Sequence, residues 1–181
     1  MIAKETKLKG CFLIKPKIFE DSRGYFFESF NQQKFNKSIG LDINFIQDNE
    51  SFSVKGALRG LHYQKGKFAQ AKLVRVIKGC VLDIAVDIRK NSPTFGKHIS
   101  LELSEDNKTQ LFIPRGFAHG FVVLSNTALF SYKCDNFYNK ESERGFIYND
   151  KSLHIDWMLP EETLIISEKD LELPAFKDVR F

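Results

Sequence analysis

The chain has 181 residues, of which 43% are hydrophobic and 28% are charged, and its formal net charge is +4. These proportions are ordinary for a soluble globular protein and exclude a chain that is mainly disordered. No run of roughly five like charges indicates a nucleic-acid-binding tail, and no apolar run approaches the about 18 residues of a membrane-spanning helix.

The three cysteines, Cys11, Cys80 and Cys134, are widely spaced and form no CxxC pair. This pattern favours reduced thiols over a disulfide framework. The first residues include several lysines and lack the apolar stretch of a signal peptide. Since no repeat or linker-like segment divides the chain, we expect one domain over residues 1–181, in the cytoplasm, with no nucleic-acid or membrane partner.

Short apolar segments recur along the chain at intervals typical of an all-β sandwich or barrel. Phenylalanine is abundant, with 18 residues, and favours strands. Strands are predicted at residues 11–14, 25–30, 44–47, 57–62, 71–77, 81–88, 98–103, 109–113, 120–124 and 128–133.

Two helical segments are predicted among these strands. The first covers residues 31–39, with Asn31 as its N-cap and Gly40 just past its end. The second is a short turn near residues 167–171, where Ser167 can cap the first helical N–H groups.

The dipeptide Lys78-Gly79 lies between two strongly apolar strands and predicts a hairpin turn. That hairpin would place Lys72 and Asp83 on neighbouring strands. If both side chains point inward, they are buried charges that need each other.

Two glycines bracket an arginine and lead into a histidine within residues 56–64. Gly60 allows a close backbone approach, and the planar fork of Arg59 suits a phosphate or carboxylate. Considered alone, Arg59 would be interpreted as a surface charge and His62 as a structural histidine. Because the two lie within four positions of each other, together they indicate a functional site.

His119 follows a Pro-x-Gly turn and enters an apolar strand. In cupin barrels such a histidine is often a metal ligand, but a metal needs more ligands than this. The position two residues after His62 holds Gln64 instead of a second histidine. We therefore expect no metal and interpret His119 as a hydrogen-bonding group in a pocket.

Other candidate residues have an equally simple structural explanation. Tyr132 alternates with Phe130 as a core aromatic residue would, and Asp170 lies at a solvated helix end unless it orients a histidine. Residues 47–51 are interpreted as a polar loop. Arg23-Gly24 is interpreted as a tight basic turn, after which Phe26 and Glu28 share a strand face. No Gly-rich nucleotide loop and no GxSxG elbow occurs, so no nucleotide cofactor is indicated.

Several of these segments, taken in order, resemble the dTDP-4-dehydrorhamnose 3,5-epimerase family; they are residues 21–28, 47–53, 56–64, 72–76, 81–89 and 113–121. The similarity runs from about residue 10 to about residue 170. It implies a cupin-type jelly roll of antiparallel strands with a few short helices, a homodimer, and no metal or other cofactor. It also implies a bacterial pathway that makes deoxysugars for lipopolysaccharide or capsule.

The chain departs from the family pattern in its C-terminal third. Asn139 and Lys140 stand where a proline usually follows the tyrosine, and Tyr148 stands where tryptophan is usual. Lys151 and Met158 also replace usual prolines. None of these positions is among the expected acid–base residues.

The resemblance implies an enzyme that inverts C3 and C5 of dTDP-4-dehydro-6-deoxy-D-glucose through an enolate. His62 would be the base, with Asp170 holding its ring, and Tyr132 the acid on the opposite face. Lys72 would stabilise the enolate oxygen, and Asp83 would keep that lysine charged.

The same resemblance implies a set of substrate-binding side chains. Arg23 and Arg59 would bind the diphosphate, and Phe26 and Tyr138 would stack on the pyrimidine. The full set is Arg23, Phe26, Glu28, Gln47, Asp48, Asn49, Arg59, Lys72, Asp83, His119, Tyr138, Glu143 and Lys169.

Other functions remain open at this point. The same residues would serve an epimerase that inverts only C3 or only C5, or one that acts on another nucleotide sugar, such as a GDP-linked capsule sugar. A non-catalytic sugar-nucleotide-binding cupin and a metal-dependent oxygenase are alternatives of other classes.

Overall fold

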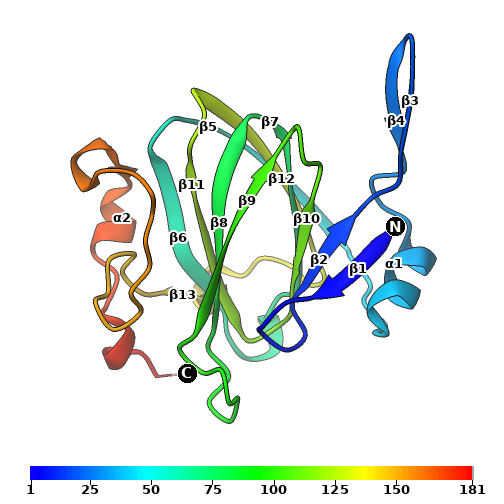
Figure 1. Cartoon of the computed structure of the whole chain (residues 1–181). Helices are drawn as coiled ribbons and strands as arrows, with labels where there is room; N and C mark the ends of the chain where they lie inside the picture. The colour runs from blue at the N-terminus through cyan, green and yellow to red at the C-terminus, as the bar shows by residue number, and fades with distance from the viewer. Residues whose placement is uncertain (181) are drawn as a thin grey trace.

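Two antiparallel sheets face each other in the computed structural model, which describes residues 1–180 (Figure 1). The first sheet has the order β1 (Ile2–Glu5), β2 (Phe12–Lys15), β10 (Gln110–Ile113), β7 (Lys72–Lys78), β12 (Thr127–Cys134) and β5 (Gln47–Val54). The second has the order β13 (Glu143–Gly145), β6 (Ala57–Gln64), β11 (Phe117–Val123), β8 (Cys80–Asp87) and β9 (His98–Ser104), and the short β14 (Ile165–Ile166) pairs in parallel with β6.

The remaining elements lie outside these two sheets. The strands β3 (Ile18–Asp21) and β4 (Gly24–Phe27) form a separate hairpin, and the helices are α1 (Gln32–Ile39) and α2 (Glu168–Leu171). The 3₁₀ turns are Gly66–Phe68, Lys140–Ser142, Glu161–Thr163 and Phe176–Asp178. The expected antiparallel jelly roll with a few short helices is thereby confirmed.

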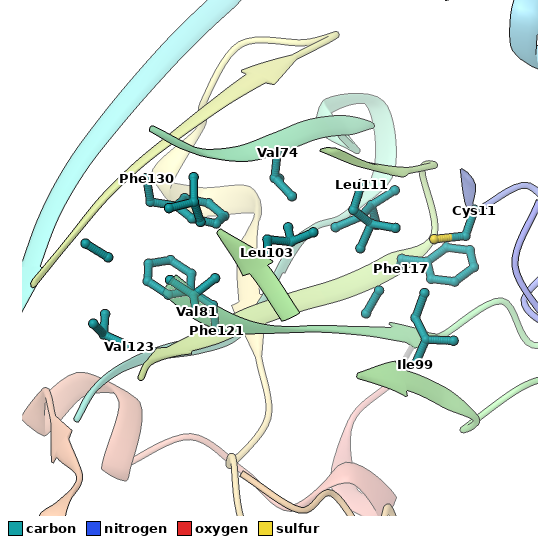
Figure 2. Close-up of a cluster of buried hydrophobic side chains, with 14 of the residues drawn as sticks. Cys11, Val74, Val81, Ile99, Leu103, Leu111, Phe117, Phe121, Val123 and Phe130 are labelled. Carbon is teal, nitrogen blue, oxygen red and sulfur yellow. The ribbon is translucent and has the colours of Figure 1, made fainter. Parts of the chain in front are cut away.

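The main core lies between the sheets, where inward side chains of both interlock (Figure 2). Phe130 of the first sheet stacks on Phe121 of the second, with ring centroids 4.2 Å apart. Burying each large apolar side chain stabilises the fold by about 1.5–3 kcal/mol. The labelled members are Cys11, Val74, Val81, Ile99, Leu103, Leu111, Phe117, Phe121, Val123 and Phe130.

The outer face of each sheet is also covered over part of its area. Helix α1 places Phe35 against Phe112 and Leu73 of the first sheet. The C-terminal third packs Phe146 and Trp157 on the second sheet. Strand β8 is therefore buried on both faces, which explains its nearly continuous apolar sequence.

The cap residues of α1 agree with the prediction. Asn31 accepts the N–H of Lys34 through its side chain, and Gly40 adopts a left-handed conformation with φ of 70°. Ser167 likewise accepts the N–H of Asp170 at the start of α2.

The predicted hairpin at Lys78-Gly79 is wrong, because β7 and β8 belong to different sheets. The chain turns a corner there, and a Cβ atom on Gly79 would lie 2.1 Å from the carbonyl oxygen of Thr127. The interpretation of residues 47–51 as a loop is also wrong. They begin β5, an edge strand that pairs along its length with β12, which satisfies the backbone groups on that side.

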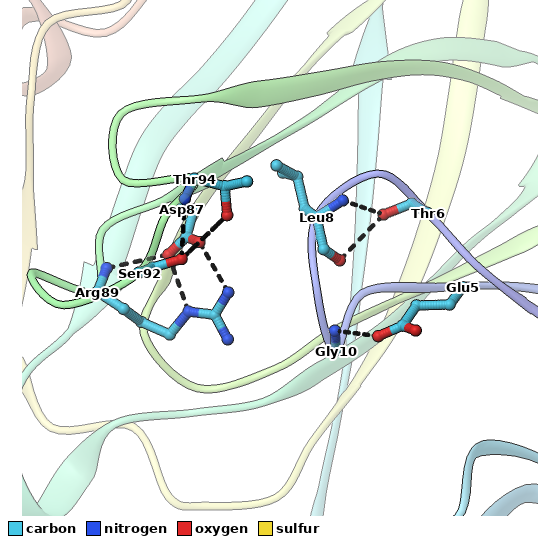
Figure 3. Close-up of polar contacts among 8 residues, drawn as sticks. All are labelled: Glu5, Thr6, Leu8, Gly10, Asp87, Arg89, Ser92 and Thr94. Carbon is cyan, nitrogen blue, oxygen red and sulfur yellow. Dashed lines mark hydrogen bonds and ion pairs between the residues drawn. The ribbon is translucent and has the colours of Figure 1, made fainter.

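The connection after β8 is held by the buried carboxylate of Asp87 (Figure 3). It accepts five hydrogen bonds: the N–H, Nε and Nη2 of Arg89, and the hydroxyls of Ser92 and Thr94. Burial by itself would raise the pKa of Asp87, but these bonds lower it to about 2. In the β1–β2 turn, Glu5 accepts the N–H of Gly10.

Among the described residues, no helix is long and apolar enough to cross a membrane. All three cysteines are free thiols.

Candidate active site

Two adjoining hollows open between the sheets, with volumes of about 250 Å³ and about 280 Å³. Both are lined by His62, Lys72 and Tyr132, which come from β6, β7 and β12. The first is completed by Gln47, Asn49, Tyr63, Gln64, Gln70, Tyr138 and Glu143. The second is completed by Ser51, Arg59, His119, Phe121, Phe130, Ser167, Lys169 and Asp170.

His62 and Asp170 form a hydrogen-bonded pair in the second hollow. Nε2 of His62 lies 2.7 Å from Oδ1 of Asp170, and the N–H of Gly60 donates to Oδ2 at 3.4 Å. Burial would raise the pKa of Asp170, but the bond from His62 lowers it below its usual range. The carboxylate therefore accepts Nε2–H, which leaves Nδ1 of His62 with a lone pair that can take a proton.

A second histidine lies beside the first, because His119 on β11 is the register partner of His62 on β6. The two strands approach closely at two glycines. A Cβ atom on Gly60 would lie 2.5 Å from Cα of Gly120, and one on Gly120 would lie 2.7 Å from the carbonyl oxygen of Arg59. Larger residues here would push the strands apart and separate the two imidazoles.

His119 is bound to the fully buried Asp83, with Nε2 2.9 Å from Oδ2. The other carboxylate oxygen, Oδ1, has no hydrogen-bond partner among the described residues. Burial lowers the pKa of Lys72 below its usual value, and the charges of Cys134, Asp83 and Glu143 offset this only in part. Asp83 is thus buried, and its negative charge lies directly behind His119, which lines the second hollow.

Tyr132 faces this group from the other sheet. Burial raises the pKa of its phenol, so the hydroxyl keeps its proton at neutral pH. The Nζ atom of Lys72 lies 5.8 Å from the ring centroid. The hydroxyl makes no hydrogen bond with any residue that the structure describes, unlike a core tyrosine whose hydroxyl is satisfied.

A polar network surrounds the mouth of the first hollow. Oε2 of Glu143 accepts hydrogen bonds from the Tyr138 hydroxyl at 3.0 Å and from Nζ of Lys169 at 2.6 Å. Nε2 of Gln47 donates to Oδ1 of Asn49 at 3.1 Å. These acceptors and donors suit sugar and base hydroxyl, carbonyl and N–H groups.

Some expected binding residues do not lie in this cavity. Arg23 and Phe26 are on the β3–β4 hairpin, which projects from the body on the side opposite α2 (Figure 1). Arg23 pairs with Asp21, and Glu28 accepts from Lys34 and Asn31. Asp48 points to the outer face of β5, where Nζ of Lys133 contacts it at 2.9 Å; the residues on either side of it, Gln47 and Asn49, face the cavity instead.

Sequence reasoning missed other lining residues, of which Gln64 is the most deeply buried polar one, with 8% of its surface exposed. One signal was available, since Gln64 follows His62 by two residues and so shares its strand face.

No group of three or more His, Cys, Asp or Glu side chains that could hold a metal converges anywhere in residues 1–180.

Comparison with known proteins gives consistent results. The family model described as dTDP-4-dehydrorhamnose 3,5-epimerase matches residues 5–178. The chain is 51% identical over 177 residues to the Shigella flexneri protein of that description, covering 98% of this chain and 97% of that protein.

Two crystal structures superpose closely on this chain. One is the dTDP-4-dehydrorhamnose 3,5-epimerase of Elizabethkingia anophelis, with 59% identity, a TM-score of 0.95, and coverage of 99% of this chain and 98% of the other. The second is the Legionella pneumophila dTDP-6-deoxy-D-glucose-3,5-epimerase in complex with dTDP-4-keto-L-rhamnose, with 46% identity, a TM-score of 0.94, and coverage of 98% and 94%.

Proposed function

Because the chain belongs to the dTDP-4-dehydrorhamnose 3,5-epimerase family, we propose that it inverts C3 and C5 of dTDP-4-dehydro-6-deoxy-D-glucose to give dTDP-4-dehydro-L-rhamnose. It is an epimerase of the dTDP-rhamnose pathway. The chemistry follows from the 4-keto group, because the hydrogens on C3 and C5 are both α to a carbonyl. Removing either as a proton leaves an enolate, and protonation from the other face inverts the carbon.

One observation supports the proposal most strongly: a base and an acid from opposite sheets line the same cavity. His62 belongs to β6 and Tyr132 to β12. In each half-reaction, His62 takes the proton from carbon, and the C–H electrons form the enolate. Tyr132 donates its phenolic proton to the opposite face, and solvent then restores both groups. General acid–base help of this kind is worth about 10²–10⁴-fold.

The enolate oxygen needs a positive charge beside it. Lys72 lies in both hollows, and although burial lowers its pKa, the charges of Cys134, Asp83 and Glu143 oppose that effect. A charge already aimed at a developing oxyanion contributes about 3–4 kcal/mol. His119, fixed by Asp83, provides a further polar group at this end of the cavity.

The nucleotide portion would bind toward the mouth. Arg59 offers its guanidinium to the diphosphate, and Nε is already oriented by a 3.1 Å hydrogen bond to the Ser53 hydroxyl. Gln47, Asn49 and Glu143 supply groups for the base and sugars, and Lys169 adds a second cation.

The residues of the β3–β4 hairpin would contribute to the cavity of a second copy in a homodimer. Phe19, Tyr25 and Phe26 of the hairpin are 53%, 58% and 70% exposed, and Phe52 on the outer face of β5 is 63% exposed. Large apolar patches on a soluble chain indicate an interface. A hairpin that crosses to a second copy would bring Arg23 and Phe26 to the partner's cavity. Sedimentation analysis tests this, and a monomer at micromolar concentration contradicts it.

The remaining parts of the proposal concern the chain as a whole. It acts as one domain in the cytoplasm, where its three free thiols stay reduced, and its product enters a surface polysaccharide.

The reaction is tested by incubating the protein with dTDP-4-dehydro-6-deoxy-D-glucose in deuterated water. We expect deuterium at both C3 and C5, with inverted stereochemistry, and no exchange at either carbon with His62→Asn. Exchange at one carbon alone would indicate a single-centre epimerase, and binding without exchange a non-catalytic cupin. Stoichiometric iron, manganese or nickel in the purified protein would contradict the proposed chemistry.

A further inference from the structure

The side chain of Gln64 has all of its hydrogen-bond donors engaged inside the protein, although it lines the cavity. Its Nε2 donates to the carbonyl oxygens of Phe68 and Phe137, at 2.8 and 3.1 Å, and its Oε1 accepts the N–H of Asn139 at 2.6 Å. A carboxamide has two N–H donors, and both are used here. Gln64 therefore has no donor to offer a ligand unless one of these bonds breaks.

The three partners belong to two different loops. Phe68 lies in the connection from β6 to β7, which leads to Lys72. Phe137 and Asn139 lie in the connection from β12 to β13, which leads to Glu143. Gln64 thus ties both loops to the strand that carries His62.

Its bonds hold the backbone on both sides of Tyr138. The carbonyl before Tyr138 and the N–H after it are the groups that Gln64 binds. The N–H of Tyr138 itself donates to Oε1 of Gln47 at 3.0 Å, and its hydroxyl donates to Glu143. Asn139 closes the turn by accepting the N–H of Ser142 at 2.9 Å through its side chain.

We propose that Gln64 is a positioning residue that holds Tyr138, and through it Glu143, in the arrangement that receives the nucleotide sugar. The proposal rests on the proposed function for the identity of the ligand. Since Gln64 makes no bond to His62 or Asp170, its loss should weaken substrate binding more than it slows proton transfer. Partly buried peptide groups left without partners would rearrange, and Tyr138 would move with them.

Gln64→Met tests this, because methionine has a similar length and cannot make these hydrogen bonds. We expect the KM for the nucleotide sugar and the Kd for dTDP to rise about tenfold, which corresponds to about 1.4 kcal/mol. We expect kcat to fall less than about threefold.

Asn136→Leu is the matched control, because Asn136 does not line the cavity. Its Nδ2 donates to the carbonyl oxygens of Lys67 and Ala69, at 2.8 and 3.3 Å, and so joins the same two loops without binding the peptide groups that flank Tyr138. We expect its KM and Kd to stay within about threefold of wild type. Equal losses in both variants would show a general loosening of the loops and would overturn the proposal.

A double-mutant cycle with Tyr138→Ala asks whether Gln64 acts through Tyr138. If it does, the KM of the double variant matches that of Tyr138→Ala, because the group to be positioned is already gone. If the increases in KM of the two single variants multiply in the double variant, Gln64 does not act through Tyr138. A lower kcat with unchanged KM would also contradict the positioning role.

Two provisions keep the result interpretable. If Gln64→Met does not fold, Gln64→Glu replaces it: glutamate keeps the acceptor for Asn139 and loses the donors to Phe68 and Phe137, and the same rise in KM and Kd is expected. Calorimetric binding of dTDP does not depend on turnover. Wild-type protein that binds dTDP without deuterium exchange would overturn the proposed function and leave the comparison of Gln64 with Asn136 valid.

Discussion

Nε2 of His62 lies 2.7 Å from Oδ1 of Asp170, although 108 positions separate the two residues in the chain. The short strand β14 makes this possible, because it pairs with β6 and delivers the segment that begins α2. The carboxylate lies on a turn whose first N–H groups are capped by Ser167. The base is therefore oriented by the C-terminal segment and not by its own sheet.

Asp170→Asn should lower kcat by about 10²-fold or more, with a smaller effect on KM. If the asparagine oxygen still accepts the N–H of Gly60, its NH₂ group faces Nε2 of His62. The ring must then carry its proton on Nδ1, which removes the lone pair that acts as base. Steady-state kinetics at neutral pH measures this. A variant with kcat within about threefold of wild type would show that Asp170 does not orient the base.

Tyr132→Phe should separate proton removal from inversion. The phenol is assigned to protonation of the face opposite His62, whereas removal of the proton by His62 needs Lys72 and Asp170 but not the phenol. Deuterium should enter the sugar without inversion, because the enolate recaptures a proton from the original side. Mass spectrometry and NMR on one sample measure both quantities. Full turnover to inverted product would exclude Tyr132 as the acid, and Tyr138 would be the next residue to test.

Arg59→Ala should raise KM much more than it lowers kcat. Its guanidinium would bind the diphosphate in the ground state and in the transition state alike, which is uniform binding. Initial rates over a range of substrate concentrations test this, with Arg144→Ala as a control: that guanidinium lies near the mouth but donates to the carbonyl oxygens of Glu141 and Glu143. A large loss of kcat at unchanged KM would contradict the role.

Asp87→Asn should destabilise the protein by about 2 kcal/mol at neutral pH. The carboxylate has a folded-state pKa of about 2 against an ordinary 3.8, so its contribution is present above 3.8 and is lost as pH falls toward 2. The difference between wild type and variant should therefore shrink over that pH range. Urea unfolding at several pH values measures it.

Asp21→Asn is the control for that experiment. Its carboxylate also binds an arginine two residues later, but the pair is exposed: 52% of the Asp21 side chain and 88% of the Arg23 side chain are accessible. Exposed pairs contribute little to stability. An equal effect of both substitutions would show that burial of the Asp87 network is unimportant.

Much of the fold could be predicted from local patterns. Apolar segments of strand length, the Asn31 and Gly40 caps and the Ser167 cap all act through neighbouring residues. The structure has the caps and most of these strands as expected, but the strand predicted at residues 44–47 is wrong, because β5 begins only at Gln47. The family resemblance also followed from sequence, because its motifs are contiguous. The short strands β1, β3, β13 and β14 were not predicted, because they are too brief for a periodic pattern.

Strand pairing was decided only by the tertiary structure. The sequence around Gly79 suits a hairpin equally well, but the inward faces of β7 and β8 can bury their side chains only when the strands lie in opposite sheets. Residues 47–51 are polar because one face of β5 lines the cavity and the other meets solvent, and their strand conformation depends on hydrogen bonds to β12.

For the cavity, too, sequence and tertiary structure determine different properties. The sequence by itself determined which side chains carry acid, base and charge, since those properties belong to residue types. The family resemblance implied that His62 meets Asp170, and the structure has that contact. Only the tertiary structure decided that His119 meets Asp83 and that Gln64 meets the backbone around Tyr138. It also placed Arg23 and Phe26 on a hairpin away from the cavity of their own chain. Hydrogen bonds act over about 3 Å, so residues far apart in sequence interact only where the packing of two sheets and a returning C-terminal segment brings them together.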